Sequence, residues 1–272
     1  MSRPDLSIVT VSHNHAAYLD TCLSMLAPDR HSLTLEVFVV DNVSTDNTAE
    51  IVRQYAWVQL IANTQRQGFA ANNNRAIRQC RGRYVLLLNP DTAVQPGTLE
   101  TLVTYMDAHP RVGICGPQLV FPDGQVQPSC RRFPTLSSVL ARRTPLRRWL
   151  WNSALNARHL MSDFDHTVTS EVDWMLGACL MTRREFLQTV GLMDEGFFLY
   201  VEDIDWCYRA WQAEWQVVYV AEARLTHHHL AVSDRKLFSH YSWYHLQSMW
   251  RYYRKHLAPN WLRLQVQEER LS

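Results

Sequence analysis

The sequence predicts an α/β fold in which helices cover both faces of a mostly parallel central sheet. Short, continuously apolar segments recur along the first 115 residues, helical patterns separate them, and polar residues follow most of them directly. Strands that are buried on both faces of a parallel sheet lack polar alternation, as these segments do. Ligands of such sheets bind beyond the carboxyl ends of the strands, where the polar residues would lie.

Apolar runs rich in β-branched residues predict five strands in this region: Leu6–Val11, Leu33–Val40, Val58–Ala62, Tyr84–Leu88 and Val112–Cys115. Helical spacing predicts helices between them, one from Tyr18 to Leu26 that Pro28 closes and one over Phe69–Cys80. Ser44-Thr45-Asp46 and Pro96-Gly97 are the start signals of two more helices. The alternation of strand and helix is typical of a parallel sheet.

The second half of the chain is harder to divide into elements. Prolines interrupt residues 116–170, Val217–Val220 is typical of a strand, and Phe238–Leu257 predicts an amphipathic, aromatic helix. That helix could pack against the domain or a dimer partner, or lie at a membrane interface. Six arginines fall within 18 residues and suit either an anionic lipid surface or a solvated loop with ion pairs: Arg131, Arg132, Arg142, Arg143, Arg147 and Arg148.

Composition excludes several classes of protein. The 272 residues include 10 Trp, 11 Tyr and 9 Phe, too much apolar surface for a disordered chain, and a net charge of +1 gives no global attraction to nucleic acid. There is no G-x-G-x-x-G motif after the first strand and no G-x-x-x-x-G-K-[ST] motif, which disfavours dinucleotide dehydrogenases and P-loop enzymes. Without a CxxC pair, a signal-peptide pattern or an apolar run of about 20 residues, we expect a soluble, cytoplasmic protein.

Polar residues mark one predicted edge of the sheet. Ser12-His13 and Asp41 come directly after apolar strands, and Asp91 follows another one after Asn89-Pro90. Asp and Asn often only end strands and cap helices, and that explanation holds for each residue taken singly. Three such signals at one edge favour a ligand site.

A second candidate site lies in the C-terminal half. Glu202, Asp203 and Asp205 stand among apolar and aromatic residues, and a carboxylate beside an apolar wall can have a raised pKa and act as a general base. The alternative is that these acids only offset the dipole at a helix N-terminus. Thr226 precedes three consecutive histidines, His227 to His229, of which at most two could share one metal site on an extended segment.

Seven segments together resemble glycosyltransferase family 2, the inverting enzymes with the Rossmann-like GT-A fold, and most closely its bacterial rhamnosyltransferase-like branch. The resemblance runs from Ser7 to about Ser233, and its motifs stand in the order of the family: SIVTVSHN, VFVVDNVSTDNT, GFAANNNRAI, YVLLLNPDT, WMLGACLMTRREF, GLMDEGFFLYVEDIDWCYR and THHHLAVS. The resemblance implies a single GT-A domain. Its nucleotide-sugar-binding half would span residues 1–115, its acceptor-binding and catalytic half residues 116–233, and a C-terminal helical extension residues 234–272.

The resemblance also implies roles for residues on the donor side. Ser12, His13 and Asp41 would meet the nucleotide base, and Asn89-Pro90-Asp91 occupies the place of the Asp-x-Asp motif. Asp91 and His228 would hold Mg²⁺ or Mn²⁺, with His227 as the second choice for the histidine. Arg66 and Gly68 stand where the family has Asn-x-Gly near the diphosphate, although Arg66 departs from that pattern.

On the acceptor side, Asp203 matches the catalytic base of the family, with Glu202 and Asp205 as its positioning partners. Asp194 would border the acceptor. The residues that would line the sugar site are Trp174, Gly177 and Ala178. One base and no nucleophile implies a single displacement with inversion.

The resemblance therefore implies metal-dependent transfer of one sugar, L-rhamnose from dTDP-rhamnose, to a saccharide or lipid-linked acceptor of bacterial surface polysaccharide synthesis. UDP-hexose donors and a noncatalytic nucleotide-sugar or glycan-binding homologue stay open as alternatives. A lipid-linked acceptor would place the protein at the inner face of the plasma membrane, and an oligomer stays open as well.

Overall fold

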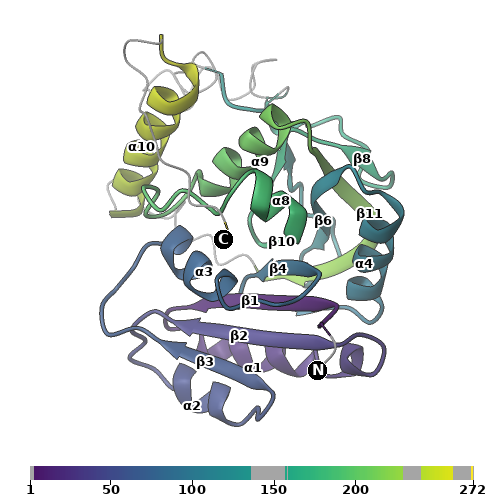
Figure 1. Ribbon diagram of the computed structural model, residues 1–272, viewed down its shortest axis with the longest axis vertical. Coiled ribbons are helices and arrows are strands. Elements are labelled where there is room, and N and C mark those ends of the chain that lie inside the picture. Colours follow the sequence, from purple (N-terminus) through teal and green to yellow (C-terminus); the bar gives the residue numbers. More distant parts are fainter. Residues whose placement is uncertain (1–2, 136–156, 158, 229–239, 260–270, 272) are drawn as a thin grey trace.

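The computed structural model describes residues 3–135, 157, 159–228, 240–259 and 271. One large sheet forms its centre, with the strand order β3-β2-β1-β4-β10-β6-β11-β5 and β8 paired to β11 (Figure 1). The strands of this sheet are β1 (Leu6–Ser12), β2 (Leu35–Asp41), β3 (Val58–Ala62), β4 (Tyr84–Leu88), β5 (Thr92–Val94), β6 (Val112–Val120), β8 (Ser170–Glu171), β10 (Cys179–Arg183) and β11 (Gln216–His227). A separate pair joins β7 (Cys130–Arg131) to β9 (Trp174–Met175).

The first half of the sheet is parallel, as the sequence predicts, and the second half is mixed. β1 pairs in parallel with β2 and with β4, and β2 pairs in parallel with β3. β10 lies antiparallel between β4 and β6, so a strand from the C-terminal half is inserted into the N-terminal half. The predicted boundary after residue 115 falls inside β6, and the two predicted halves share one sheet.

Helices cover both faces of this sheet (Figure 1). In chain order they are α1 (Ala16–Ser24), the 3₁₀ turn η1 (Pro28–His31), α2 (Thr48–Arg53), α3 (Phe69–Ile77), α4 (Thr98–Ala108), α8 (Arg184–Thr189), α9 (Glu202–Gln212), α10 (His240–Tyr252) and the π-helical turn η2 (Tyr253–Leu257). The predicted helix over residues 238–257 is therefore present as α10 and η2 across its described part.

Two apolar cores form because successive side chains of a strand point to opposite faces. In β2, Phe38 and Val40 belong to the core that includes residues of α3, α8 and α9, whereas Val37 and Val39 belong to the core that includes residues of α1 and α4. All four of these side chains are buried. Strands covered on both faces need no polar positions, which explains the continuously apolar runs in the sequence.

Candidate active site

Parallel pairing brings the predicted donor-side residues to one edge of the sheet. Ser12 is the register partner of Asp41, so β1 and β2 end at the same level. β4 is the other neighbour of β1 and ends at Leu88, directly before Asn89-Pro90-Asp91. The three polar signals of the sequence thus lie beyond the carboxyl ends of three adjacent strands.

Hydrogen bonds fix the loops at this edge. Asp41 Oδ1 accepts from the Ser44 N–H at 3.0 Å, and the His13 imidazole Nδ1 lies 2.9 Å from the carbonyl oxygen of Asn42. Ser12 is fully buried, and its hydroxyl has no hydrogen-bond partner within the described residues. The predicted contact of Ser12 with the nucleotide base stays a prediction.

An asparagine network, which the sequence analysis did not identify, holds the predicted diphosphate loop. The Asn42 amide binds the backbone of Gln67 twice, donating to its carbonyl oxygen and accepting from its N–H, each at 2.9 Å. Asn63 donates to Asn42 at 3.1 Å and to Asn72 at 2.6 Å, and Asn72 donates to the Gly68 carbonyl at 2.9 Å. The available signal was the run of asparagines inside the apolar pattern of α3, since buried amides need partners.

Gly68 and Arg66 differ in their surroundings within this loop. A Cβ atom on Gly68 would lie 2.8 Å from the carbonyl oxygen of Phe198, so only glycine permits this close approach of two backbones. The Phe69 N–H donates to the same oxygen at 2.8 Å. Arg66 is exposed. Its predicted contact with the diphosphate stays a prediction.

Asp91 is buried beside histidines. The His227 Nε2 atom lies 3.6 Å from Asp91 Oδ1, and the other ring nitrogen of His227 lies 2.9 Å from Gln127 Oε1. Burial alone would raise the pKa of Asp91, but the contact with His227 and the nearby charge of His15 outweigh it and lower that pKa. Asp91 is therefore a carboxylate at neutral pH, the form that a hard divalent cation binds.

The two predicted metal-binding histidines have different surroundings. The His228 backbone N–H donates to the Asp91 carbonyl oxygen at 2.9 Å, while its ring packs 5.2 Å from the Tyr18 ring. His227 is the histidine whose ring contacts the Asp91 carboxylate. Among the described residues there is no cluster of three or more His, Cys, Asp or Glu side chains that could hold a metal ion. The assignment to Asp91 and His228 stays a prediction.

The segment 177–178 connects the predicted base to the Asn89-Pro90-Asp91 turn. The Gly177 N–H donates to Asp203 Oδ2 at 3.1 Å, and the next carbonyl, that of Ala178, accepts from the Asn89 N–H at 2.9 Å. The Ile204 N–H donates to Asp203 Oδ1 at 2.8 Å. Both oxygens of Asp203 are thereby oriented by backbone groups next to the donor-side turn.

Glu202, which is buried, and Asp203, which is partly exposed, form an acidic pair at the N-terminus of α9. Burial raises the pKa of both groups, and the charge of Asp203 raises that of Glu202 further. Glu202 is 5% exposed, and its Oε2 atom has no hydrogen-bond partner within the described residues. A carboxyl group with a pKa nearer to neutrality is well suited to take a proton from a hydroxyl.

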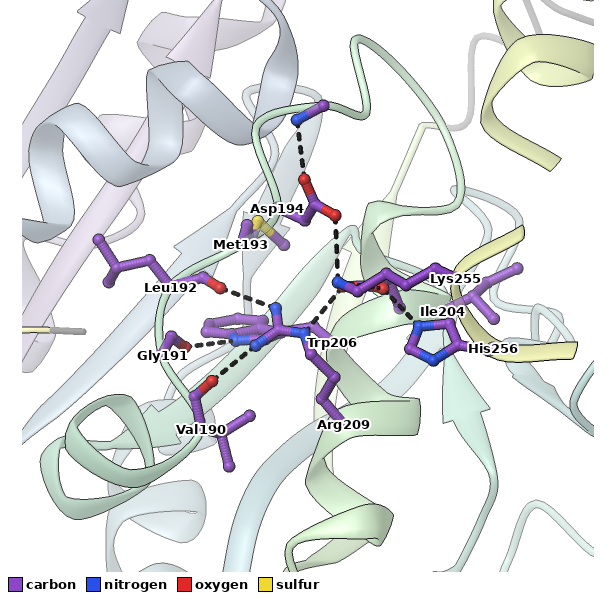
Figure 2. Close-up of polar contacts among 12 residues, drawn as sticks. Val190, Gly191, Leu192, Met193, Asp194, Ile204, Trp206, Arg209, Lys255 and His256 are labelled. Carbon is purple, nitrogen blue, oxygen red and sulfur yellow. Dashed lines mark hydrogen bonds and ion pairs between the residues drawn. The ribbon is translucent and has the colours of Figure 1, made fainter. Parts of the chain in front are cut away.

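Asp205 and Asp194 both lie in ion pairs, and Figure 2 shows the one between Asp194 and Lys255. Asp205 is fully buried and binds Arg209 Nε at 2.9 Å and His256 Nε2 at 2.7 Å. Burial alone would raise the pKa of Asp205, but the charge of Arg209 and the hydrogen bond with His256 lower it. Asp194 binds Arg251 Nη2 at 2.8 Å. Their predicted roles beside the base and the acceptor stay predictions.

The Trp174 side chain is hydrogen-bonded within the protein. Its indole N–H donates to the Arg132 carbonyl oxygen at 2.9 Å, and its side chain is 7% exposed. Arg132 in turn pairs with Asp173 at 3.0 Å. The other arginines of the predicted basic segment, Arg142, Arg143, Arg147 and Arg148, lie outside the described residues.

Comparison with known proteins shows which family and fold the chain is similar to. Residues 7–191 match the model of "Glycosyl transferase family 2". The chain is 31% identical to the N-acetylglucosaminyl-diphospho-decaprenol L-rhamnosyltransferase of Mycobacterium tuberculosis (strain ATCC 25618 / H37Rv), over 88% of this chain and 81% of the relative. It is 29% identical to rhamnosyltransferase WbbL of Escherichia coli (strain K12), over 93% of this chain and 94% of the relative.

Among solved structures, the mannosyltransferase PcManGT of Pyrobaculum calidifontis, in complex with GDP-Man and Mn²⁺, is similar with a TM-score of 0.59. It is 21% identical, and the match covers 95% of this chain and 67% of that one. A similarity at this level of identity shows the fold. The predicted GT-A fold is confirmed.

Proposed function

Because the chain belongs to glycosyltransferase family 2, we propose that it transfers L-rhamnose from dTDP-rhamnose to a lipid-linked N-acetylglucosaminyl diphosphate. The names of its two rhamnosyltransferase relatives support the sugar, and the name of the mycobacterial relative supports the acceptor. The structural observation that supports the proposal is the hydrogen-bonded path from Asp203 through Gly177-Ala178 to Asn89, because it connects the proposed base to the proposed donor-side turn.

Asp203 is the proposed catalytic base. The oxygen of the acceptor hydroxyl would form the new bond to the anomeric carbon while its proton moves to Asp203. The bond from that carbon to the diphosphate would break, and its electron pair would leave with the diphosphate. A single displacement of this kind inverts the anomeric configuration. Glu202, buried beside Asp203 and itself favoured in the protonated form, would keep a second negative charge away from the base.

Asp91 and His227 would hold a divalent cation, with His228 as the alternative histidine. The carboxylate and imidazole suit Mg²⁺ or Mn²⁺, and such an ion would supply positive charge to the leaving diphosphate. Ser12, His13 and Asp41 would bind the nucleotide base from the ends of β1 and β2. The crystal complex of the mannosyltransferase with Mn²⁺ supports a divalent metal in this fold.

If the acceptor is lipid-linked, the protein would act at the inner face of the plasma membrane. No helix within the described residues is both long and apolar enough to span a bilayer. The outer face of α10 exposes Trp243 (60%), Leu246 (48%) and Trp250 (56%), which recur at helical spacing. Tryptophans of this kind favour the headgroup layer, so the exposed face of α10 is the proposed point of contact with lipid.

Thermal unfolding with dTDP, UDP or GDP, each with Mn²⁺ and with EDTA, tests the donor site. A ligand at 100 times its Kd stabilises the folded state by about 2.7 kcal/mol, which raises the unfolding midpoint by several degrees. We expect a Mn²⁺-dependent increase with dTDP. An increase with UDP alone would support a UDP-hexose donor, and no increase with any nucleotide would contradict a donor site.

A further inference from the structure

The inner face of α10 covers the segment that leads into α9, residues 194–201, which lies beyond the part of the chain that matches the family model. The Tyr244 ring stacks on Phe198 at 4.6 Å, and His245 packs 5.6 Å from Tyr200. Ser248 Oγ donates to the Leu199 carbonyl oxygen at 3.0 Å.

Arg251 extends this contact to the beginning of the segment. It binds Asp194 through two nitrogens, at 2.8 and 3.2 Å, and its guanidinium lies 5.5 Å from the Phe197 ring centre. Residues at positions 244, 248, 251 and 255 share one face of a helix. α10 and η2 therefore contact most of the 194–201 segment with a single face.

Lys255 joins two carboxylates that lie on either side of Asp203 in the sequence. Its Nζ atom is 3.1 Å from Asp194 Oδ2 and 2.9 Å from Asp205 Oδ1, and its side chain is 7% exposed. Figure 2 shows Lys255 between Asp194 and the N-terminal turns of α9, with His256 next to it. One buried ammonium thus links the start of the 194–201 segment to α9.

The segment ends in a strained turn directly before the acidic pair. Tyr200 and Val201 have φ angles of 69° and 74°, a left-handed conformation that a β-branched residue strongly disfavours. Such strain persists only where the surroundings enforce it. The contacts of α10 with Leu199 and Tyr200 supply part of that enforcement. If these contacts were lost, Tyr200 and Val201 could leave the left-handed conformation, and Glu202 and Asp203, which follow directly, would move.

We propose that Lys255 is a positioning residue for sugar transfer, which by joining Asp194 to Asp205 holds α10 against the 194–201 segment and so fixes Asp203. The inference rests on the proposed function, since it assumes that Asp203 is the base. Lys255 itself touches no reacting atom. Its removal should therefore slow the chemical step more than it weakens donor binding.

The variant that tests this is Lys255→Met, which keeps the length of the side chain and removes its charge. In Lys255→Met, Asp194 keeps Arg251, and Asp205 keeps Arg209 and His256. Arg53→Met is the matched control, because Arg53 forms an ion pair with Glu50 in which both side chains are 63% exposed. Ser248→Ala is a milder second variant, which removes only the hydroxyl that binds Leu199.

Steady-state kinetics should separate positioning from general destabilisation. Below its unfolding midpoint, Lys255→Met should lower kcat by about tenfold or more, since small displacements of a catalytic group are costly, while the donor KM changes by less than about twofold. Ser248→Ala should show a smaller loss of the same kind, and Arg53→Met none. An unchanged kcat in folded Lys255→Met, or a donor KM that rises in proportion, would overturn the proposal.

Hydrogen exchange gives a second readout that does not depend on transfer. Amides of residues 194–205 should exchange faster in Lys255→Met than in the wild type, and at the wild-type rate in Arg53→Met. Unchanged exchange would contradict the positioning role even if kcat fell. If the wild type transfers no sugar, the proposed function fails, and exchange alone still decides whether Lys255 holds the segment.

Discussion

Asp203 is the residue on which the proposed chemistry depends most, because backbone N–H groups already orient both of its oxygens. Asp203→Asn keeps the shape of the side chain and removes its ability to take a proton. We expect kcat to fall by at least about 100-fold, the usual contribution of a general base, while nucleotide binding is retained. Nucleotide-dependent unfolding and transfer rates of the same preparation check this, and retained turnover would exclude Asp203 as the base.

The pH dependence of transfer follows from the same carboxyl group. Burial raises the pKa of Asp203 in the folded protein. The base must be ionised to accept a proton, so activity should increase with pH and be lost as Asp203 becomes protonated. The midpoint of this acidic limb of kcat should lie above about 4, the value of an unperturbed aspartate. A midpoint at or below about 4 would contradict Asp203 as a base with a raised pKa.

The sequence predicts His228 as the metal ligand, whereas the structure brings the ring of His227 to the Asp91 carboxylate. Substitution of each histidine distinguishes these two possibilities. His227→Ala should raise the nucleotide Kd in Mn²⁺ at least about tenfold, equivalent to about 1.4 kcal/mol, because the His227 ring contacts Asp91. His228→Ala should have the smaller effect, since its ring packs on Tyr18. Titration of each variant with nucleotide in Mn²⁺ and in EDTA checks this. The reverse order would support His228 as the metal ligand.

Among the elements, α3 connects the loop that contains Gln67 and Gly68 to the 194–201 segment. Its first turn binds the Phe198 carbonyl through Phe69, and its Asn74 amide donates to the Met193 carbonyl at 2.8 Å. The asparagine network holds Gln67 and Gly68 at the other end of the loop. Movement of α3 would therefore alter the donor side and the 194–201 segment together.

Gly68→Ala tests this connection. The new methyl group would lie 2.8 Å from the Phe198 carbonyl oxygen, a backbone atom that cannot turn away. Overpacking of this kind should lower the free energy of unfolding by about 1–3 kcal/mol and should also lower kcat. Gln65→Ala, an exposed neighbour in the same loop, is the control. Wild-type kcat and stability in Gly68→Ala would show that the loop and the segment move independently.

Most helices and strands could be predicted from the local sequence pattern. Where a strand extends further than predicted, the additional residues are held by contacts with distant parts of the chain. The first, third and fourth strands lie within about a residue of the predicted bounds, because apolar runs and polar ends define them. β6 continues five residues beyond the predicted Cys115. Its extra residues pair with β11, and pairing between segments about 100 residues apart is invisible to a local pattern.

Over the whole molecule, motif order identifies the family, while long-range contacts build the site. The sequence alone places Asp41, Asp91 and Asp203 on separate segments. The insertion of β10 between β4 and β6 brings residues 177–178 to Asn89 and so connects the base to the donor edge. The ion pairs of Lys255 with Asp194 and Asp205 could not be predicted either, since nothing local in the helical pattern of residues 238–257 specifies partners 50 and 61 residues away.

Sugar transfer can be assayed with purified protein, dTDP-rhamnose and a polyprenyl-diphosphate-linked N-acetylglucosamine. We expect one rhamnose to be added per acceptor in Mn²⁺ or Mg²⁺, with inverted anomeric configuration, and no product with EDTA or with Asp203→Asn. Absence of product from the wild type with dTDP-rhamnose, while the nucleotide stabilises the fold, would contradict the proposed donor and acceptor. Undiminished product from Asp203→Asn would contradict the proposed mechanism.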